Sequence, residues 1–277
     1  MADPKPIHPA ATVMLLRDGP GGLEVFMVVR HDEIDFMAGA LVFPGGRVDE
    51  SDRDPRLRDF ASGADGLSET ALATRTAVIR EAFEESGVLL ARFRGESNLI
   101  SADRLRSLRQ TYRKQLHAGE TSILEMVRTE NLNLACDLLV RFAHWIGPEQ
   151  APKRFDTQFY LAAAPENHLA VHDGTESVDS VWIRPKDALA EAEAGRRNIV
   201  FPTRMNLAKL SRSDTVDQAL STARASKIVT VCPELVQTPN GPALRIPPEA
   251  DYDLVEIPIK DLPPVRHGKG AAGAGRN

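Results

Sequence analysis

Three glutamates, Glu81, Glu84 and Glu85, lie within five consecutive residues. Successive residues of an α-helix rotate by about 100°, so Glu85 would lie about 40° from Glu81, and Glu84 about 60° to the other side. This spacing predicts three carboxylates on one helix face, where like charges repel. Mg²⁺ or Mn²⁺ would remove that repulsion, because both ions prefer oxygen ligands and keep positions open for a phosphate group. A solvated acidic face is the alternative interpretation.

The neighbouring segments favour a ligand site. Ser68 or Thr70 is expected to begin a helix that runs to about Ser86, with Gly87 at its C-terminal stop. Upstream, residues 39–46 are expected to form a short strand that ends in a Pro-Gly-Gly turn. A glycine turn lets backbone groups approach a ligand closely, so the strand, the turn and the acidic helix together favour metal binding.

Residues 80–88, "REAFEESGV", match the second half of the Nudix box, commonly written G-x5-E-x7-R-E-U-x-E-E-x-G-U with U apolar. The first half is displaced: Gly46 lies 34 positions before Arg80, against 14 in the family pattern, so 20 residues are inserted. Lengthening a loop costs only about 0.6 kcal/mol per doubling, so both halves can still meet. Asp52 stands where the family has glutamate. Glu50, Glu69 or no residue at all are the alternatives for that position.

The chain therefore resembles the Nudix hydrolase superfamily, and residues 31–52, 141–165 and 180–189 resemble the subgroup that includes the peroxisomal coenzyme A diphosphatase of animals. The resemblance covers roughly residues 8–212. It implies an α+β Nudix fold, a mixed sheet sandwiched between helices (α/β/α), with a helical insertion at about 101–131. Residues 213–262 are expected to form a C-terminal extension packed on this domain, and residues 263–277 a disordered tail.

The resemblance implies a metal-dependent hydrolase that cleaves the pyrophosphate bond of a nucleoside diphosphate derivative, with coenzyme A or an acyl-CoA as candidate substrate. Glu81, Glu84, Glu85 and the Gly45 carbonyl would bind Mg²⁺ or Mn²⁺, and Arg80 would orient a glutamate. The other class of function is a non-catalytic Nudix-like binding or regulatory module. Such modules usually lose one of the box glutamates, and this chain keeps all three in the helix.

Several arginines are weaker candidates for substrate binding. Arg30 lies at the end of a strand, and Arg47 follows the glycine turn, so either could contact phosphate; Arg47 could also simply be solvated. Arg154 could face the site or form a strand-end ion pair with Asp156. The basic helix at 104–114 could meet a 3′-phosphate, but an exposed face of the inserted helices is the preferred interpretation.

The remaining periodicity predicts the other elements. A hairpin is expected at 11–18 and 23–31, further strands at 138–146, 154–164, 180–185, 228–231 and 243–246, and helices at 101–119, 122–131, 185–195, 203–212 and 215–225, with an exposed loop at 49–68.

Composition argues against nucleic acid and membranes as binding partners. The 277 residues carry a formal net charge of −5, which gives no global electrostatic reason to bind nucleic acid or an anionic membrane. No stretch reaches the roughly 18 apolar residues of a membrane span, and residues 1–10 do not read as a signal peptide. Two isolated cysteines suit a reducing compartment, so the expectation is a cytoplasmic protein. The resemblance is also compatible with a homodimer.

Overall fold

A computed structural model of the chain describes residues 6–31, 37–151, 153–165, 170, 172 and 177–263. Its centre is a mixed sheet in which the strands follow the order β10-β7-β8-β1-β2-β3, while β4 also pairs with β1 and β9 with β2. β1 is antiparallel to β2 and parallel to β8. The strands are β1 (Ile7–Gly19), β2 (Gly22–Arg30), β3 (Leu41–Val42), β4 (Gly45–Arg47), β7 (Val140–Ile146), β8 (Arg154–Ala163), β9 (Ser177–Ile183) and β10 (Thr230–Val231).

Alternating side chains of the central strands bury both faces of this sheet. In β1, Val13 and Leu15 belong to one hydrophobic core, whereas Met14 and Leu16 belong to the other. A strand with apolar residues at successive positions must be covered on both faces, because successive side chains point to opposite sides. The sequence of β1 therefore requires a helix layer above the sheet and another below it.

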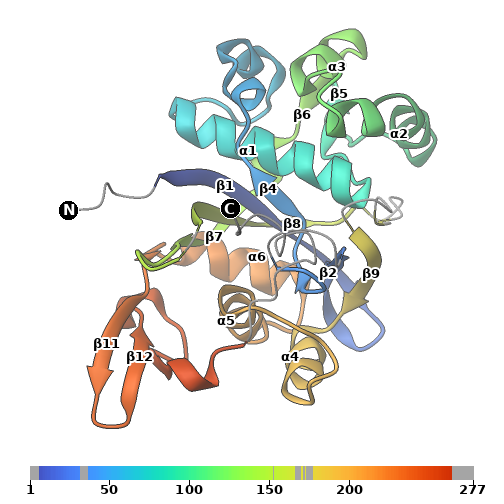
Figure 1. Cartoon of the computed structure of the whole chain (residues 1–277). Helices are drawn as coiled ribbons and strands as arrows, with labels where there is room; N and C mark the ends of the chain where they lie inside the picture. Colours follow the sequence, from blue (N-terminus) through green and yellow to red (C-terminus); the bar gives the residue numbers. More distant parts are fainter. Residues whose placement is uncertain are drawn as a thin grey trace, which may run out of the picture.

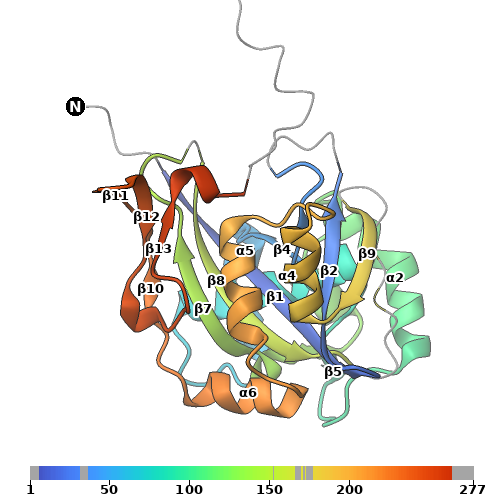
Figure 2. The same ribbon diagram turned by 90° about the horizontal axis from the view of Figure 1, so that it is seen from below.

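Figures 1 and 2 show these two layers: α1, α2 and α3 lie over one face, and α4, α5 and α6 lie on the other side. The helices are α1 (Glu69–Glu81), α2 (Ala102–His117), α3 (Ile123–Thr129), α4 (Pro185–Glu193), α5 (Phe201–Leu210) and α6 (Val216–Ala225). All six overlap the helices expected from the sequence. The hairpin of β1 and β2 and the strands β7, β8 and β9 are also confirmed, with β9 beginning three residues earlier than expected.

Short elements account for most differences from the sequence-based expectation. The expected loop at 49–68 contains two 3₁₀-helices, Glu50–Arg53 and Pro55–Phe60. The small strands β5 (Ala91–Phe93) and β6 (Leu132–Leu134) pair with each other, although nothing in their composition predicts strands. Elements of three residues are set by a partner that is distant in the sequence, so local propensity does not reveal them.

The C-terminal residues form a second sheet, made of β11 (Glu234–Thr238), β12 (Gly241–Arg245) and β13 (Glu256–Pro258). Only a strand near β12 was expected there. Tyr252 connects this region to the main sheet, because its hydroxyl accepts a hydrogen bond from Trp145 Nε1 (2.9 Å) and donates one to Asn206 Oδ1 (2.8 Å). The expected boundary between the Nudix domain and its C-terminal extension, at residues 212 and 213, stays a prediction. Residues 264–277 of the expected disordered tail lie outside the described residues.

Among the helices of the described residues, none is long and apolar enough to cross a membrane.

Candidate functional site

The acidic helix begins and ends as its sequence predicts. Ser68 Oγ accepts a hydrogen bond from the Ala71 amide (3.2 Å) and caps the N-terminus of α1. After Glu81 the helix widens into a π-helical turn, Ala82–Ser86, and Gly87 ends it with φ +70°. The π-helical turn is a correction to the prediction, since the 100° spacing between successive residues does not hold through Glu84 and Glu85. Such turns occur frequently at functional sites.

The structure brings the two halves of the split motif together, with β4 lying beneath α1 (Figure 1). The Gly45 amide donates a hydrogen bond to Glu85 Oε2 (2.9 Å), although the two residues are 40 positions apart. At Gly46, a Cβ atom would overlap the carboxylate of Glu81. Glycine at both positions therefore lets the backbone of β4 approach two carboxylates of the acidic helix.

Gly45 itself has no room for a side chain. A Cβ atom there would lie 2.5 Å from the Ala11 carbonyl oxygen and 2.7 Å from Thr12 Cα, both in the backbone of β1. We expect Gly45→Ala to lower the free energy of unfolding by about 1–3 kcal/mol, the usual range for overpacking. Urea denaturation should show this loss. At Gly147 a Cβ would meet only ordinary contacts at 3.5 Å, so Gly147→Ala should behave nearly like the wild type; an equal loss in both variants would contradict the steric argument.

Arg80 links the inserted segment to the acidic helix. Its Nε and Nη2 donate to Oδ1 and Oδ2 of Asp52 (3.0 and 2.9 Å), a bidentate pair in which Asp52 is fully buried. Nη1 reaches Glu81 Oε1 (2.9 Å) and Glu84 Oε1 (3.3 Å). Among the three acids considered for the first glutamate position, Asp52 contacts Arg80, whereas Glu50 and Glu69 are exposed.

Burial raises the proton affinity of these carboxyl groups. Desolvation raises the pKa of Glu81 to about 8, even though the charge of Arg80 acts in the opposite direction. Desolvation also raises the pKa values of Glu84 and Asp52, again against the hydrogen bonds and charge of Arg80. One guanidinium therefore compensates only part of the negative charge that the fold has collected here.

The inserted helix α2 supports the end of the acidic helix. Arg113 donates from Nε to the Glu84 carbonyl (2.7 Å) and from Nη2 to the Glu85 carbonyl (3.0 Å), and Arg109 Nε donates to the Gly87 carbonyl (2.7 Å). These carbonyls belong to a helix end, where intrahelical partners run out. His117 Nδ1 lies 3.8 Å from Glu84 Oε2.

These contacts were not predicted from the sequence, because the basic residues of α2 were expected to form an exposed face. The available signal was the four-residue spacing of Arg109 and Arg113, which places both on one face of the helix. The helix packs through Leu105, Leu108 and Leu116, which are buried.

The three candidate substrate-binding arginines have different surroundings. Arg47 Nη2 lies 3.3 Å from His8 Nδ1 on the exposed end of β4. Arg154 donates to the Gly147 carbonyl (3.0 Å) instead of pairing with Asp156, whose partner is His144. The Nε of Arg30 is buried without a hydrogen-bond partner among the described residues, so it retains a donor for a ligand.

The donor chemistry of the glutamate cluster fits a hard divalent cation. Carboxylate oxygens and a backbone carbonyl are the ligands that Mg²⁺ and Mn²⁺ prefer, and the close approach of Gly46 to Glu81 leaves no space for a side chain between them. Within the part of the chain that the structure describes, no three acidic, histidine or cysteine side chains are already arranged around one metal position. Arg80 Nη1 supplies the positive charge between Glu81 and Glu84 instead.

The architecture identifies the class of protein. The mixed sheet between two helix layers is the Nudix fold, and its architecture matches the crystal structure of a Nudix hydrolase from Alicyclobacillus acidocaldarius with a TM-score of 0.65. The two chains are 25% identical, and the match covers 80% of this chain and 99% of the other. The fold implied by the split box is therefore confirmed.

The family follows from the sequence itself. The model of the NUDT19 Nudix domain matches residues 62–210, more than half of the chain, and the chain belongs to this Nudix family. "Putative nudix hydrolase 7" of Caenorhabditis elegans is 28% identical over 214 residues, 77% of this chain. "Acyl-coenzyme A diphosphatase NUDT19" of Xenopus laevis is 25% identical over 225 residues, 68% of this chain. The matched parts span only 64% and 59% of the length of these two relatives.

Proposed function

We propose that this protein is a metal-dependent diphosphohydrolase that cleaves the pyrophosphate bond of a nucleoside diphosphate derivative. The observation that carries the proposal is the meeting of β4 with the acidic helix: the Gly45 amide bonds to Glu85, and Gly46 lies against Glu81. A purely solvated acidic face would not require a glycine turn packed against it. Membership of the Nudix family supports hydrolysis of this linkage.

Glu81, Glu84, Glu85 and the carbonyl of Gly45 would hold the cation. Nudix hydrolases generally use divalent metals, and we propose Mg²⁺ or Mn²⁺ for this chain. A bound cation would offset the charge of the pyrophosphate oxygens and make a water molecule more acidic. Arg80, held by Asp52, keeps Glu81 and Glu84 in place through its Nη1 donor. A carboxylate from the box or from a loop elsewhere would act as the general base toward that water.

Arginines around the cluster would bind the rest of the substrate. Arg30 is the best supported, because its buried Nε–H donor has no hydrogen-bond partner among the described residues. Arg47 follows the glycine turn directly, and its exposed guanidinium has only His8 as a hydrogen-bond partner among the described residues. We propose both as phosphate-binding residues. Arg154 is the weakest of the three, since the Gly147 carbonyl already engages its Nε.

The finer identity of the substrate stays a prediction. The Xenopus relative is named an acyl-coenzyme A diphosphatase, and we propose coenzyme A or an acyl-CoA as the substrate of this chain. A cytoplasmic location and a homodimer are likewise predictions from the sequence and its resemblance.

A substrate panel tests the proposal. Coenzyme A, ADP-ribose and NADH are incubated with the full chain, with and without Mg²⁺ or Mn²⁺, and mass spectrometry identifies the bond that breaks. We expect metal-dependent cleavage of the pyrophosphate bond in at least one of them. A folded protein that binds one of these compounds tightly and turns over none would instead be the non-catalytic module.

Arg113 is expected to act on the same site from α2. Arg113→Ala removes the donor to the Glu84 and Glu85 carbonyls, so the end of the acidic helix should loosen and its carboxylates lose their fixed positions. Outer-shell residues of metal sites typically contribute 10–100-fold in affinity, and we expect a loss of roughly 10-fold in Mn²⁺ affinity, measured by electron paramagnetic resonance. Arg106→Ala, on the exposed side of the same helix, is the control. Equal affinities in the two variants would show that α2 has no positioning role.

A further inference from the structure

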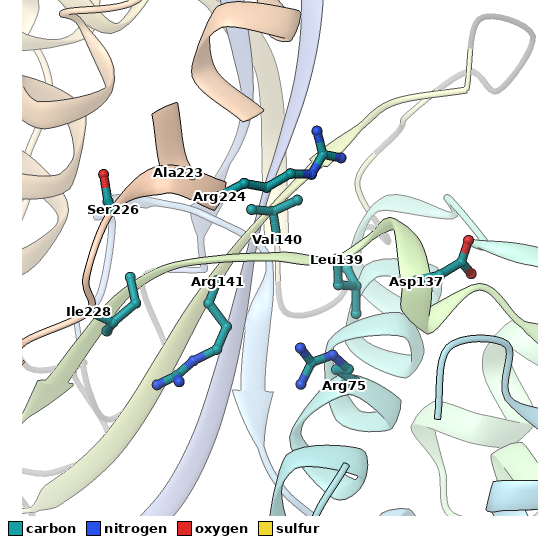
Figure 3. Close-up of a pocket in the computed structure, with 9 residues that line it drawn as sticks. All are labelled: Arg75, Asp137, Leu139, Val140, Arg141, Ala223, Arg224, Ser226 and Ile228. Atoms are coloured by element: carbon teal, nitrogen blue, oxygen red, sulfur yellow. The ribbon is translucent and has the colours of Figure 1, made fainter. Parts of the chain in front are cut away.

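Apart from the glutamate site, the structure has a pocket with a volume of about 460 Å³ at the edge of the main sheet. β10 pairs with β7 only at His144 and Trp145, so the preceding part of β7 forms the sheet edge in the described residues. α1 contributes Arg75 to this pocket, β7 contributes Arg141, and the end of α6 contributes Arg224 (Figure 3). β8 and β1 separate β7 from β4, so this pocket is not part of the glutamate site.

The pocket is positively charged. None of its three arginines forms an ion pair within the portion of the chain that the structure describes. Arg75 donates to the Ala71 carbonyl (3.3 Å) and lies over the ring of Tyr160, and Arg141 donates to Gln158 Oε1 (3.0 Å). Both guanidinium groups are thus positioned by neutral partners and keep their full charge.

Among the described residues that line the pocket, Asp137 is the one carboxylate, and it does not neutralise these arginines. Both of its oxygens are engaged by Arg92, outside the pocket lining, at 2.6 and 2.9 Å. In Figure 3, Arg75 and Arg141 extend to one side of the β7 ribbon, while the guanidinium of Arg224 lies on the other side. Unpaired cations around a concave surface favour an anionic ligand, all the more in a protein of net charge −5.

The lining also suggests what kind of anion fits. Guanidinium groups bind phosphate through paired hydrogen bonds, and a dianionic phosphate suits two of them better than a single negative charge does. Val140 and Ile228 add apolar surface next to the arginines. The volume lies within the range of small-molecule sites, about 300–1,000 Å³.

We propose that this pocket is a second binding site, for a small phosphate monoester that carries an apolar substituent. Arg75 and Arg141, whose side chains extend to the same side of β7, would bind the phosphate together. The apolar substituent would lie against Val140 and Ile228.

Phenyl phosphate is the probe for this site, titrated into the full chain by isothermal calorimetry in a buffer with EDTA. We expect one bound molecule per chain and an affinity that falls as the salt concentration rises. Arg75→Ala and Arg141→Ala should each weaken binding roughly tenfold, the value of one charge-assisted hydrogen bond. The control, Arg106→Ala, removes the same charge from the exposed face of α2 and should bind like the wild type.

Three outcomes would overturn the proposal: no binding of phenyl phosphate at concentrations up to about 10 mM, the weak end of measurable affinities; unchanged affinity in both pocket variants; or equal binding of benzoate, which carries a single negative charge. Because the measurement needs neither metal nor turnover, it can fail while the proposed hydrolase activity stands. Conversely, turnover of a diphosphate by Arg141→Ala should equal that of the wild type, whatever the titration shows.

Discussion

Glu85→Gln is expected to lower the turnover of a diphosphate substrate by roughly 100-fold or more. Glutamine keeps an oxygen that can accept the hydrogen bond from the Gly45 amide, so the contact between β4 and the acidic helix should survive. The substitution removes the negative charge that would hold a divalent cation. Loss of an outer-shell residue already reduces metal-dependent activity 10–100-fold, and loss of a direct ligand should exceed that range.

Glu69→Gln is the matched control for this loss. Glu69 lies in the first turn of the same helix but is exposed, so its neutralisation should leave both turnover and Mn²⁺ affinity close to wild type. Thermal unfolding of the metal-free proteins should give similar midpoints for the two variants. If Glu85→Gln turns over as fast as Glu69→Gln, the carboxylate of Glu85 has no role in catalysis.

Asp52→Ala is expected to produce the largest loss of stability. The side chain of Asp52 is fully buried and that of Arg80 is 6% exposed, so removing the carboxylate leaves a buried guanidinium without its bidentate partner. Breaking such a pair typically costs 3–5 kcal/mol. We expect about 3 kcal/mol, the low end of the range, because Glu81 and Glu84 still face Arg80. The midpoint of thermal unfolding should fall by about 6–12 °C.

The exposed ion pair of Asp103 with Arg106 is the control for the buried pair. Asp103→Ala removes the partner of Arg106, and both side chains of that pair are more than half exposed. Such pairs contribute about 0–1 kcal/mol, so the unfolding midpoint should hardly change. A midpoint of Asp52→Ala equal to that of Asp103→Ala would mean that the pair with Arg80 does not stabilise the fold.

Much of the candidate site follows from local sequence. Ser68 and Gly87 mark the ends of the acidic helix, because capping by a serine hydroxyl and a glycine with positive φ are local effects. The strands β1 and β2 likewise follow from continuous runs of apolar residues that can be read directly. The displaced glycine turn was also predictable, since a long insertion adds little to the free energy of loop closure.

Other parts of the site depend on contacts between distant residues. The pairing of Asp52 with Arg80 spans 28 positions, and the sequence left Glu50, Glu69 or no residue at all as alternatives. The π-helical turn changes the directions of Glu84 and Glu85, which ideal helical geometry cannot anticipate. The contact of Arg113 with the Glu84 carbonyl depends on how α2 packs against the acidic helix. The spacing of Arg109 and Arg113 places them on one helix face, but it does not show which element that face meets.

A crystal of the full chain soaked in Mn²⁺ tests the central claim most directly, because manganese gives an anomalous signal that locates the ion. We expect a peak bound by carboxylate oxygens from Glu81, Glu84 and Glu85, at roughly the 2.0–2.2 Å expected for small hard cations. The proposed metal site would be contradicted if Glu81 and Glu84 remained bonded to Arg80 and no manganese bound near Gly45, at an ion concentration that supports turnover.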